Sequence, residues 1–159
     1  MRETCTDVAF TLMVLGFALQ MALDFHPGYT DASLLPHMTF AFFHANVFHL
    51  AANMMTLHLL QPSYRNLLAA YAISFATSFL AITPFPTMGF SGILYVLIGI
   101  RTNLFTGRFS FWKGWFVMFL FAGIAMPNVN GLLHLFCFIG GLTIRIISRI
   151  SNDYAKASR

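Results

Sequence analysis

Residues 88–100 read MGFSGILYVLIGI, in which Ser91 lies close to two glycines and opens a run of ten uncharged residues that ends before Arg101. The run predicts an apolar helix that begins at the serine. A hydroxyl at the start of such a helix has no evident role in packing. The role of this hydroxyl therefore depends on which side chains lie near it.

The composition of the chain is that of a membrane protein. Of the 159 residues, 58% are hydrophobic and 9% charged, and the mean hydropathy is +0.72, far from the balance of soluble globular proteins. Residues 32–64, 66–100 and 114–144 contain no Asp, Glu, Lys or Arg. Since ~20 apolar residues cross a bilayer as a helix, each of these stretches is long enough for a span and a loop.

Prolines, glycines and charges divide the chain into six apolar segments. They lie at about residues 8–25, 40–60, 66–82, 91–105, 111–126 and 131–150, within a single domain covering residues 1–159. The first is read as a retained span, because no small-residue cleavage site follows it. All nine Lys and Arg residues fall at one set of segment ends. By the positive-inside rule, this predicts an all-α bundle of six transmembrane helices with both termini in the cytoplasm.

Polar residues inside the predicted spans are few, and they fall at one depth. His49 and Asn53 are four residues apart, and Asn46 is three before His49, so the three share one stripe of a helix. Ser91 opens the fourth segment and His134 lies near the start of the sixth. Because the second, fourth and sixth segments all enter from outside, we expect these groups to meet in the outer half of the bilayer.

A serine near a histidine favours nucleophilic catalysis. Histidine titrates near neutral pH and can take the proton of Ser91, while Asn and His side chains can donate hydrogen bonds to a tetrahedral intermediate. The chain has no HExxH motif, and its five acidic residues lie outside the spans or at their ends. We therefore expect a Ser-His dyad without an orienting carboxylate, without a metal ion and without a cofactor.

Simpler explanations exist for each residue taken alone. A serine in a membrane helix commonly bonds to its own helix backbone, and a single His or Asn can serve packing between helices. His26, His37 and His58 lie at or near segment ends, and we interpret them as incidental. The meeting of several polar groups from three segments at one depth is what favours a site.

Three motifs together resemble the rhomboid family of intramembrane serine proteases. They are HANVFHLAAN (44–53), GFSGILYVLIG (89–99) and HLFCFIGG (134–141), and they occur in the family's order on the second, fourth and sixth predicted spans. The resemblance covers about residues 37–149. A GxSG motif alone is only moderately specific, because soluble hydrolases use similar strings.

The resemblance implies a role for each matched residue. Ser91 would be the nucleophile and His134 its general base and acid. His49, Asn53 and the backbone N–H of Ser91 would form the oxyanion hole. The supporting residues would be His44 beside the polar cavity, Tyr95 packed on the His134 ring, and Gly89 and Gly92 leaving room for backbone and substrate.

The resemblance also implies partners and a location. The substrates would be transmembrane segments of other proteins, entering from the lipid bilayer beside the fifth span, where the aromatic residues 111–121 fit a gate. The site would open to the outer side, and the size of the chain favours a bacterial cytoplasmic membrane. No nucleic-acid partner is expected, and the oligomeric state stays open.

Some features depart from the family pattern. Cys137 stands where a glycine is common, so we expect the contact between the fourth and sixth segments to depend on Gly140 and Gly141.

Two other functions remain open at this point. A catalytically inactive rhomboid-like protein that binds membrane clients is the alternative function, and a small channel or transporter is a third.

Overall fold

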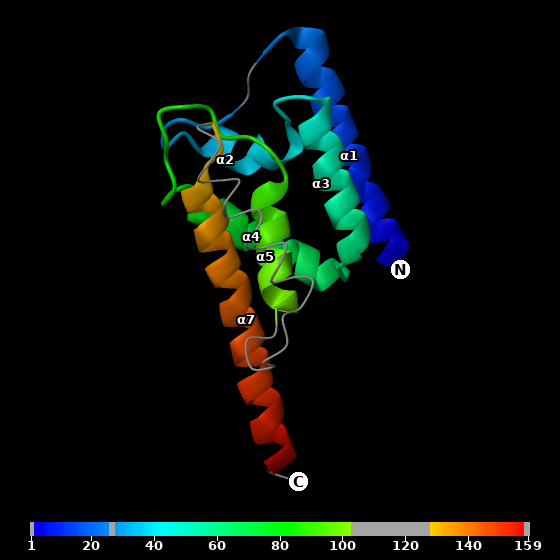
Figure 1. Ribbon diagram of the computed structural model, residues 1–159, viewed down its shortest axis with the longest axis vertical. Coiled ribbons are helices and arrows are strands. Elements are labelled where there is room, and N and C mark those ends of the chain that lie inside the picture. The colour runs from blue at the N-terminus through cyan, green and yellow to red at the C-terminus, as the bar shows by residue number, and fades with distance from the viewer. Residues whose placement is uncertain (1, 26–27, 103–127, 158–159) are drawn as a thin grey trace.

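The protein is all-α in the residues that its structure, a computed structural model, describes: 2–25, 28–102 and 128–157. This part contains six α-helices and one 3₁₀ turn (Figure 1). They are α1 (Arg2–Leu23), α2 (Leu34–Thr39), η1 (Phe40–Phe42), α3 (Val47–Leu60), α4 (Tyr64–Ser78), α5 (Ser91–Arg101) and α7 (Gly131–Ala157).

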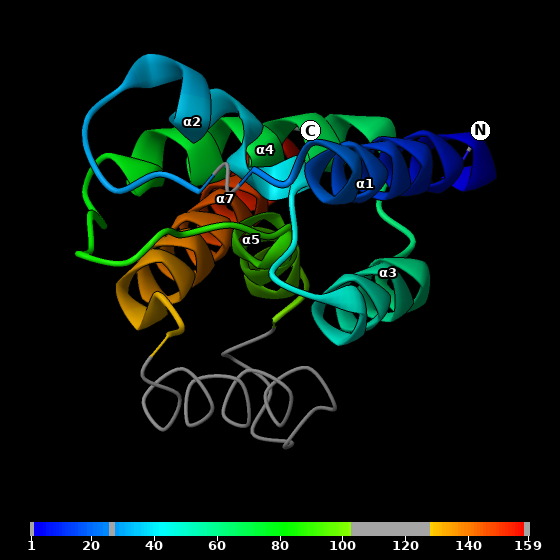
Figure 2. The same cartoon turned by 90° about the horizontal axis from the view of Figure 1, so that it is seen from above.

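Helix α5 is the centre of the bundle. It is surrounded by α3, α4 and α7, and packs most extensively against α7 (Figure 2). All residues from 92 to 99 are buried, as expected for a helix that is apolar on every side. The run that opened the sequence analysis therefore forms the core helix of the protein, with Ser91 as its first residue.

Helices α5 and α7 touch through their backbones. A Cβ atom on Gly99 would lie 2.5 Å from the carbonyl oxygen of Phe138, and one on Gly141 would collide with the carbonyl oxygen of Val96. The predicted use of Gly141 between these two helices is confirmed. Gly140 instead faces Ile73 of α4, so that part of the prediction is wrong.

The predicted second segment, residues 40–60, is not one helix. Residues 34–42 form α2 and η1, the chain is extended at Phe43, and α3 begins at Val47. Asn46 has extended backbone angles, and its side chain accepts a hydrogen bond from the His49 N–H at 2.9 Å, which is the geometry of an N-cap. Asn46 therefore starts α3 and does not lie on the stripe of His49 and Asn53.

Only two of the described helices are long and apolar enough to cross a membrane, over Cys5–Leu23 and Gly131–Lys156. Helices α3, α4 and α5 have 14, 15 and 11 residues, or about 21, 23 and 17 Å at ~1.5 Å per residue. These lengths fall short of a ~30 Å hydrocarbon core. Helix lengths therefore do not support six spanning helices. The predicted fifth segment, residues 111–126, lies outside the described residues.

Large apolar side chains are nevertheless exposed along both long helices. On α1 they include Val8 at 60%, Leu15 at 60% and Met21 at 66%, and on α7 they include Ile147 at 61%. Soluble monomers seldom expose apolar surface so extensively. These exposed side chains belong to the two helices that are long and apolar enough to cross a membrane.

Candidate active site

The hydroxyl of Ser91 lies in hydrogen-bonding contact with the ring of His134. Ser91 is the first residue of α5 and His134 lies in the first turn of α7. The distance from Ser91 Oγ to His134 Nε2 is 2.9 Å. A neutral imidazole with its proton on Nδ1 accepts the serine proton at Nε2. The structure thus brings together the two residues that the sequence predicted as a dyad.

Stacking holds the His134 ring in place. The ring of Tyr95, one helical turn after Ser91, lies parallel to it with centroids 4.3 Å apart and planes at 13°. His134 Nδ1 is buried and has no hydrogen-bond partner among the described residues. The side chain that orients this imidazole is therefore an aromatic ring, where serine hydrolases with a triad use a carboxylate.

His49 and Asn53 face the backbone just before Ser91. A Cβ atom on Gly89 would lie 2.5 Å from His49 Cε1, 2.8 Å from His49 Nε2 and 3.6 Å from Asn53 Nδ2. Gly89 has a φ of 124°, which side chains rarely tolerate. Both features let the two polar side chains lie directly against the main chain at this point.

Several hydrogen-bond donors at this point have no partner of their own. Asn53 Nδ2 is buried and makes no hydrogen bond within the described residues. The N–H of Ser91 belongs to the first turn of α5, where backbone donors lack partners within the helix. Together with His49, these donors lie around Gly89 and the start of α5. Such an arrangement suits a developing negative charge.

His44 lies against the ring of His49 and is shielded from solvent. Its side chain is fully buried, and its ring meets that of His49 edge-on with centroids 5.2 Å apart. Its Nε2 accepts the N–H of Phe90 at 3.5 Å, and its own N–H donates to Gln20 Oε1 at 3.1 Å. His44 therefore supports both the loop before Ser91 and the His49 ring.

Gly92 serves helix packing. A Cβ atom there would lie 2.5 Å from Ser74 Oγ on α4, 3.4 Å from Leu133 and 3.5 Å from Cys137 on α7. The sequence predicted that this glycine leaves room for backbone and substrate to approach. Gly92 is buried against α4 and α7, and its use by a substrate stays a prediction.

His37 is a structural centre that the sequence analysis dismissed as incidental. Its fully buried ring is stacked between Tyr29 and Phe79, with centroid distances of 4.2 and 4.0 Å. Nε2 donates to the carbonyl oxygen of Asp31 at 2.6 Å, and Nδ1 lies 2.6 Å from Ser78 Oγ. Burial also raises the pKa of Tyr29, which keeps that phenol protonated as a donor.

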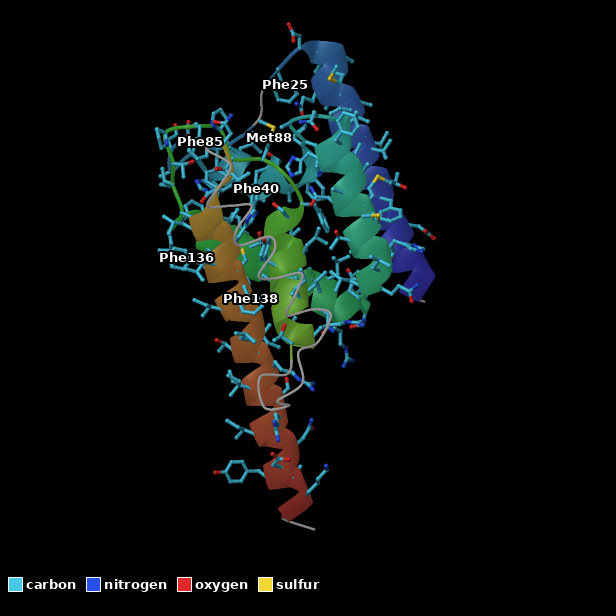
Figure 3. All side chains as sticks on the ribbon, in the orientation of Figure 1. Phe25, Phe40, Phe85, Met88, Phe136 and Phe138 are labelled. Atoms are coloured by element: carbon cyan, nitrogen blue, oxygen red, sulfur yellow. The ribbon has the colours of Figure 1, made fainter. Side chains whose placement is uncertain are left out.

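Apolar side chains gather around the site. Phe40, Phe85 and Met88 lie at the end of the molecule where α3, α5 and α7 begin (Figure 3). Phe40 is buried, with its carbonyl oxygen accepting the N–H of Gly89 at 2.9 Å. This hydrogen bond ties η1 to the loop that leads to Ser91.

The remaining predictions concern metals and substrate entry. Within the described ranges no three His, Cys, Asp or Glu side chains form a set that could hold a metal ion. The gate predicted at residues 111–121 lies outside the described residues.

Comparison with known proteins adds no assignment, since no protein-family model and no curated protein matches the chain. The function therefore has to be inferred from the geometry of the site.

Proposed function

We propose that the protein is an intramembrane serine endopeptidase of the rhomboid type, which hydrolyses peptide bonds in or near transmembrane segments. The observation that carries the proposal is the 2.9 Å contact between Ser91 Oγ and His134 Nε2. It joins the first turns of two packed helices in a chain with extensive exposed apolar surface. The three sequence motifs described above support the same reading.

The chemistry follows from these two side chains. Ser91 Oγ attacks the carbonyl carbon of the scissile peptide bond while His134 Nε2 takes the hydroxyl proton. His134 then gives this proton to the leaving amine, and an acyl-enzyme ester remains on Ser91. A water molecule, deprotonated by His134, hydrolyses the ester and restores the hydroxyl. No step needs a cofactor.

The charge on the tetrahedral intermediate needs donors. His49, Asn53 and the N–H of Ser91 are suited to this role, because they surround Gly89 and the start of α5. One such donor is worth about 2.7 to 4 kcal/mol of transition-state stabilisation, or about 10² to 10³ in kcat. Tyr95 keeps the His134 ring in the plane that the proton transfer requires.

The site suits a chain embedded in the bilayer. Helices α3, α5 and α7 begin at the same end of the molecule, the upper end in Figure 1. Arg101 ends α5 at the opposite end, where its Nη2 donates to the carbonyl oxygen of Leu60. In the proposed six-span topology the upper end is the outer side of a bacterial cytoplasmic membrane. The short helices would then start below the surface, with the loops before them held inside protein.

The test uses the full chain reconstituted in liposomes with a transmembrane reporter substrate. Wild type should cleave the reporter and react with a fluorophosphonate at Ser91, whereas Ser91→Ala should do neither. Ser74→Ala is the matched control, because Ser74 is a serine of the same bundle that faces Gly92 and not His134; it should keep both activities. Full-rate cleavage by Ser91→Ala would refute the assignment. An unreactive wild type that binds transmembrane segments would support the inactive alternative.

A further inference from the structure

Asn130 connects three separate parts of the chain at the point where α7 begins. Its side chain is buried, and Nδ2 lies 2.6 Å from the carbonyl oxygen of Ala81, 3.0 Å from Thr87 Oγ1 and 3.3 Å from Tyr29 Oη. Its Oδ1 accepts the N–H of Leu133 at 3.0 Å. One carboxamide therefore both caps α7 and holds two loops.

The partners of Asn130 belong to the connection that leads to the nucleophile. Ala81 and Thr87 lie between α4 and α5, and Thr87 is four positions before Ser91. Thr87 also exchanges two backbone hydrogen bonds with Tyr29, at 3.0 and 3.1 Å. Asn130 therefore holds the connection to Ser91 at two points, Ala81 and Thr87.

The same residue stands one turn before the base. The N–H of His134 donates to the carbonyl oxygen of Asn130 at 3.3 Å. The side chain of Asn130 reaches the loop before Ser91, while its main chain belongs to the first turn that carries His134.

We propose that Asn130 is a positioning residue that sets the contact between Ser91 and His134. Its Nδ2 group ties the start of the nucleophile helix to the start of the base helix. The inference rests on the proposed function for its effect on catalysis, while the structural tie stands on the hydrogen bonds alone. The residue type matters, because a carboxamide donates on one side and accepts on the other.

Asn130→Asp separates the two tasks of this side chain. Aspartate is as good an N-cap as asparagine, so the acceptor for Leu133 remains. A carboxylate cannot donate to the carbonyl oxygen of Ala81, the shortest of the three contacts, so this part of the tie to the loop is lost, whereas the hydroxyls of Thr87 and Tyr29 can donate to the carboxylate. A displacement of ~1 Å at reacting groups lowers turnover about 10²-fold. We therefore expect kcat for reporter cleavage to fall about 10²-fold while KM changes little.

Ser63→Ala is the matched control for a purely structural role. Ser63 caps α4, with its Oγ accepting the N–H of Asn66 at 3.3 Å, and it lies at the far end of the bundle from Ser91. Losing this cap should lower the melting temperature without lowering kcat. If Ser63→Ala and Asn130→Asp lower kcat in proportion to their loss of stability, the positioning role is overturned.

Hydrogen exchange supplies a readout that does not depend on catalysis. In a Ser91→Ala background, Asn130→Asp should accelerate exchange at the Thr87 and Gly89 amides, whose backbone acceptors are Tyr29 and Phe40. Unchanged exchange would overturn the tie. If wild type neither cleaves nor reacts with a fluorophosphonate, the proposed function fails, and the exchange data alone still decide the tie. If Asn130→Asp does not fold, Thr87→Val removes one acceptor and should give the same changes to a smaller extent.

Discussion

Replacing Gly89 by alanine tests the arrangement of donors around Ser91 most directly. The added Cβ atom would lie 2.5 Å from Cε1 of His49 and 2.8 Å from its Nε2. Ordinary van der Waals contact begins at 3.4 Å. The ring must therefore withdraw by about 0.9 Å (3.4 minus 2.5), or the loop must move by as much, because atoms at shorter range repel steeply.

Two separate costs follow from this substitution. A φ of 124° is strained for any residue with a side chain, which lowers the free energy of unfolding by about 1 to 3 kcal/mol. Displacing a proposed oxyanion donor by nearly 1 Å lowers kcat about 10²-fold. At 1.36 kcal/mol for each factor of ten, this corresponds to about 2.7 kcal/mol in the transition state.

A double-mutant cycle with His49→Ala separates the two costs. Thermal unfolding in detergent micelles gives the stability term, and reporter cleavage in liposomes gives kcat. In the His49→Ala background no ring remains to be displaced, so Gly89→Ala should cost stability but no further turnover. A Gly89→Ala enzyme with wild-type kcat would refute the proposed role of His49. Equal losses of kcat in the two backgrounds would show that the effect does not pass through the ring.

Three further substitutions test the surroundings of the site. Tyr95→Phe keeps the ring on His134 and should keep the rate of fluorophosphonate labelling. Tyr95→Leu loses a stack worth about 0.5 to 1.5 kcal/mol and should be labelled up to about tenfold more slowly. Equal labelling rates for the two variants would contradict the proposed role of the stack. Gly141→Ala overpacks the backbone contact with Val96 and should lower the free energy of unfolding by about 1 to 3 kcal/mol, so an unchanged melting curve would count against that contact. His37→Leu loses both ring hydrogen bonds and should destabilise by about 1 to 3 kcal/mol in denaturant titrations, which a wild-type midpoint would disprove.

Part of this fold could be read from local sequence. The run after Ser91 has no polar residue that could face solvent, and the structure buries it as the central helix α5. The start of α7 at Gly131 follows from the Asn-Gly pair before an apolar run. The contact between Ser91 and His134 could be predicted because polar residues inside apolar segments are few. Each needs a hydrogen-bond partner, and the other polar residues are the available ones.

Other features depend on partners that lie far away in the chain. His37 meets Ser78, 41 residues on, and Asn130 meets Tyr29, 101 residues back. No local pattern indicates such partners, so the sequence analysis treated His37 as incidental and gave Asn130 no role. The prediction of one helix over residues 40–60 was wrong for a different reason. Apolar residues continue through 40–43 without proline or glycine, and only the capping side chain of Asn46 determines where the helix begins.

The correct and the incorrect predictions about polar residues both concern the starts of three helices. Asn46 caps α3, Ser91 opens α5 and Asn130 caps α7, and these starts face one end of the molecule (Figure 1). Each helix start carries unpaired N–H groups and about half a positive charge. Polar side chains are needed there to satisfy backbone donors, and donors that stay free favour an anion. A capping requirement and an oxyanion requirement therefore both favour asparagine near a helix start: Asn46 caps α3, whereas Asn53, seven residues further on, is a proposed oxyanion donor. The residue type alone does not separate the two tasks.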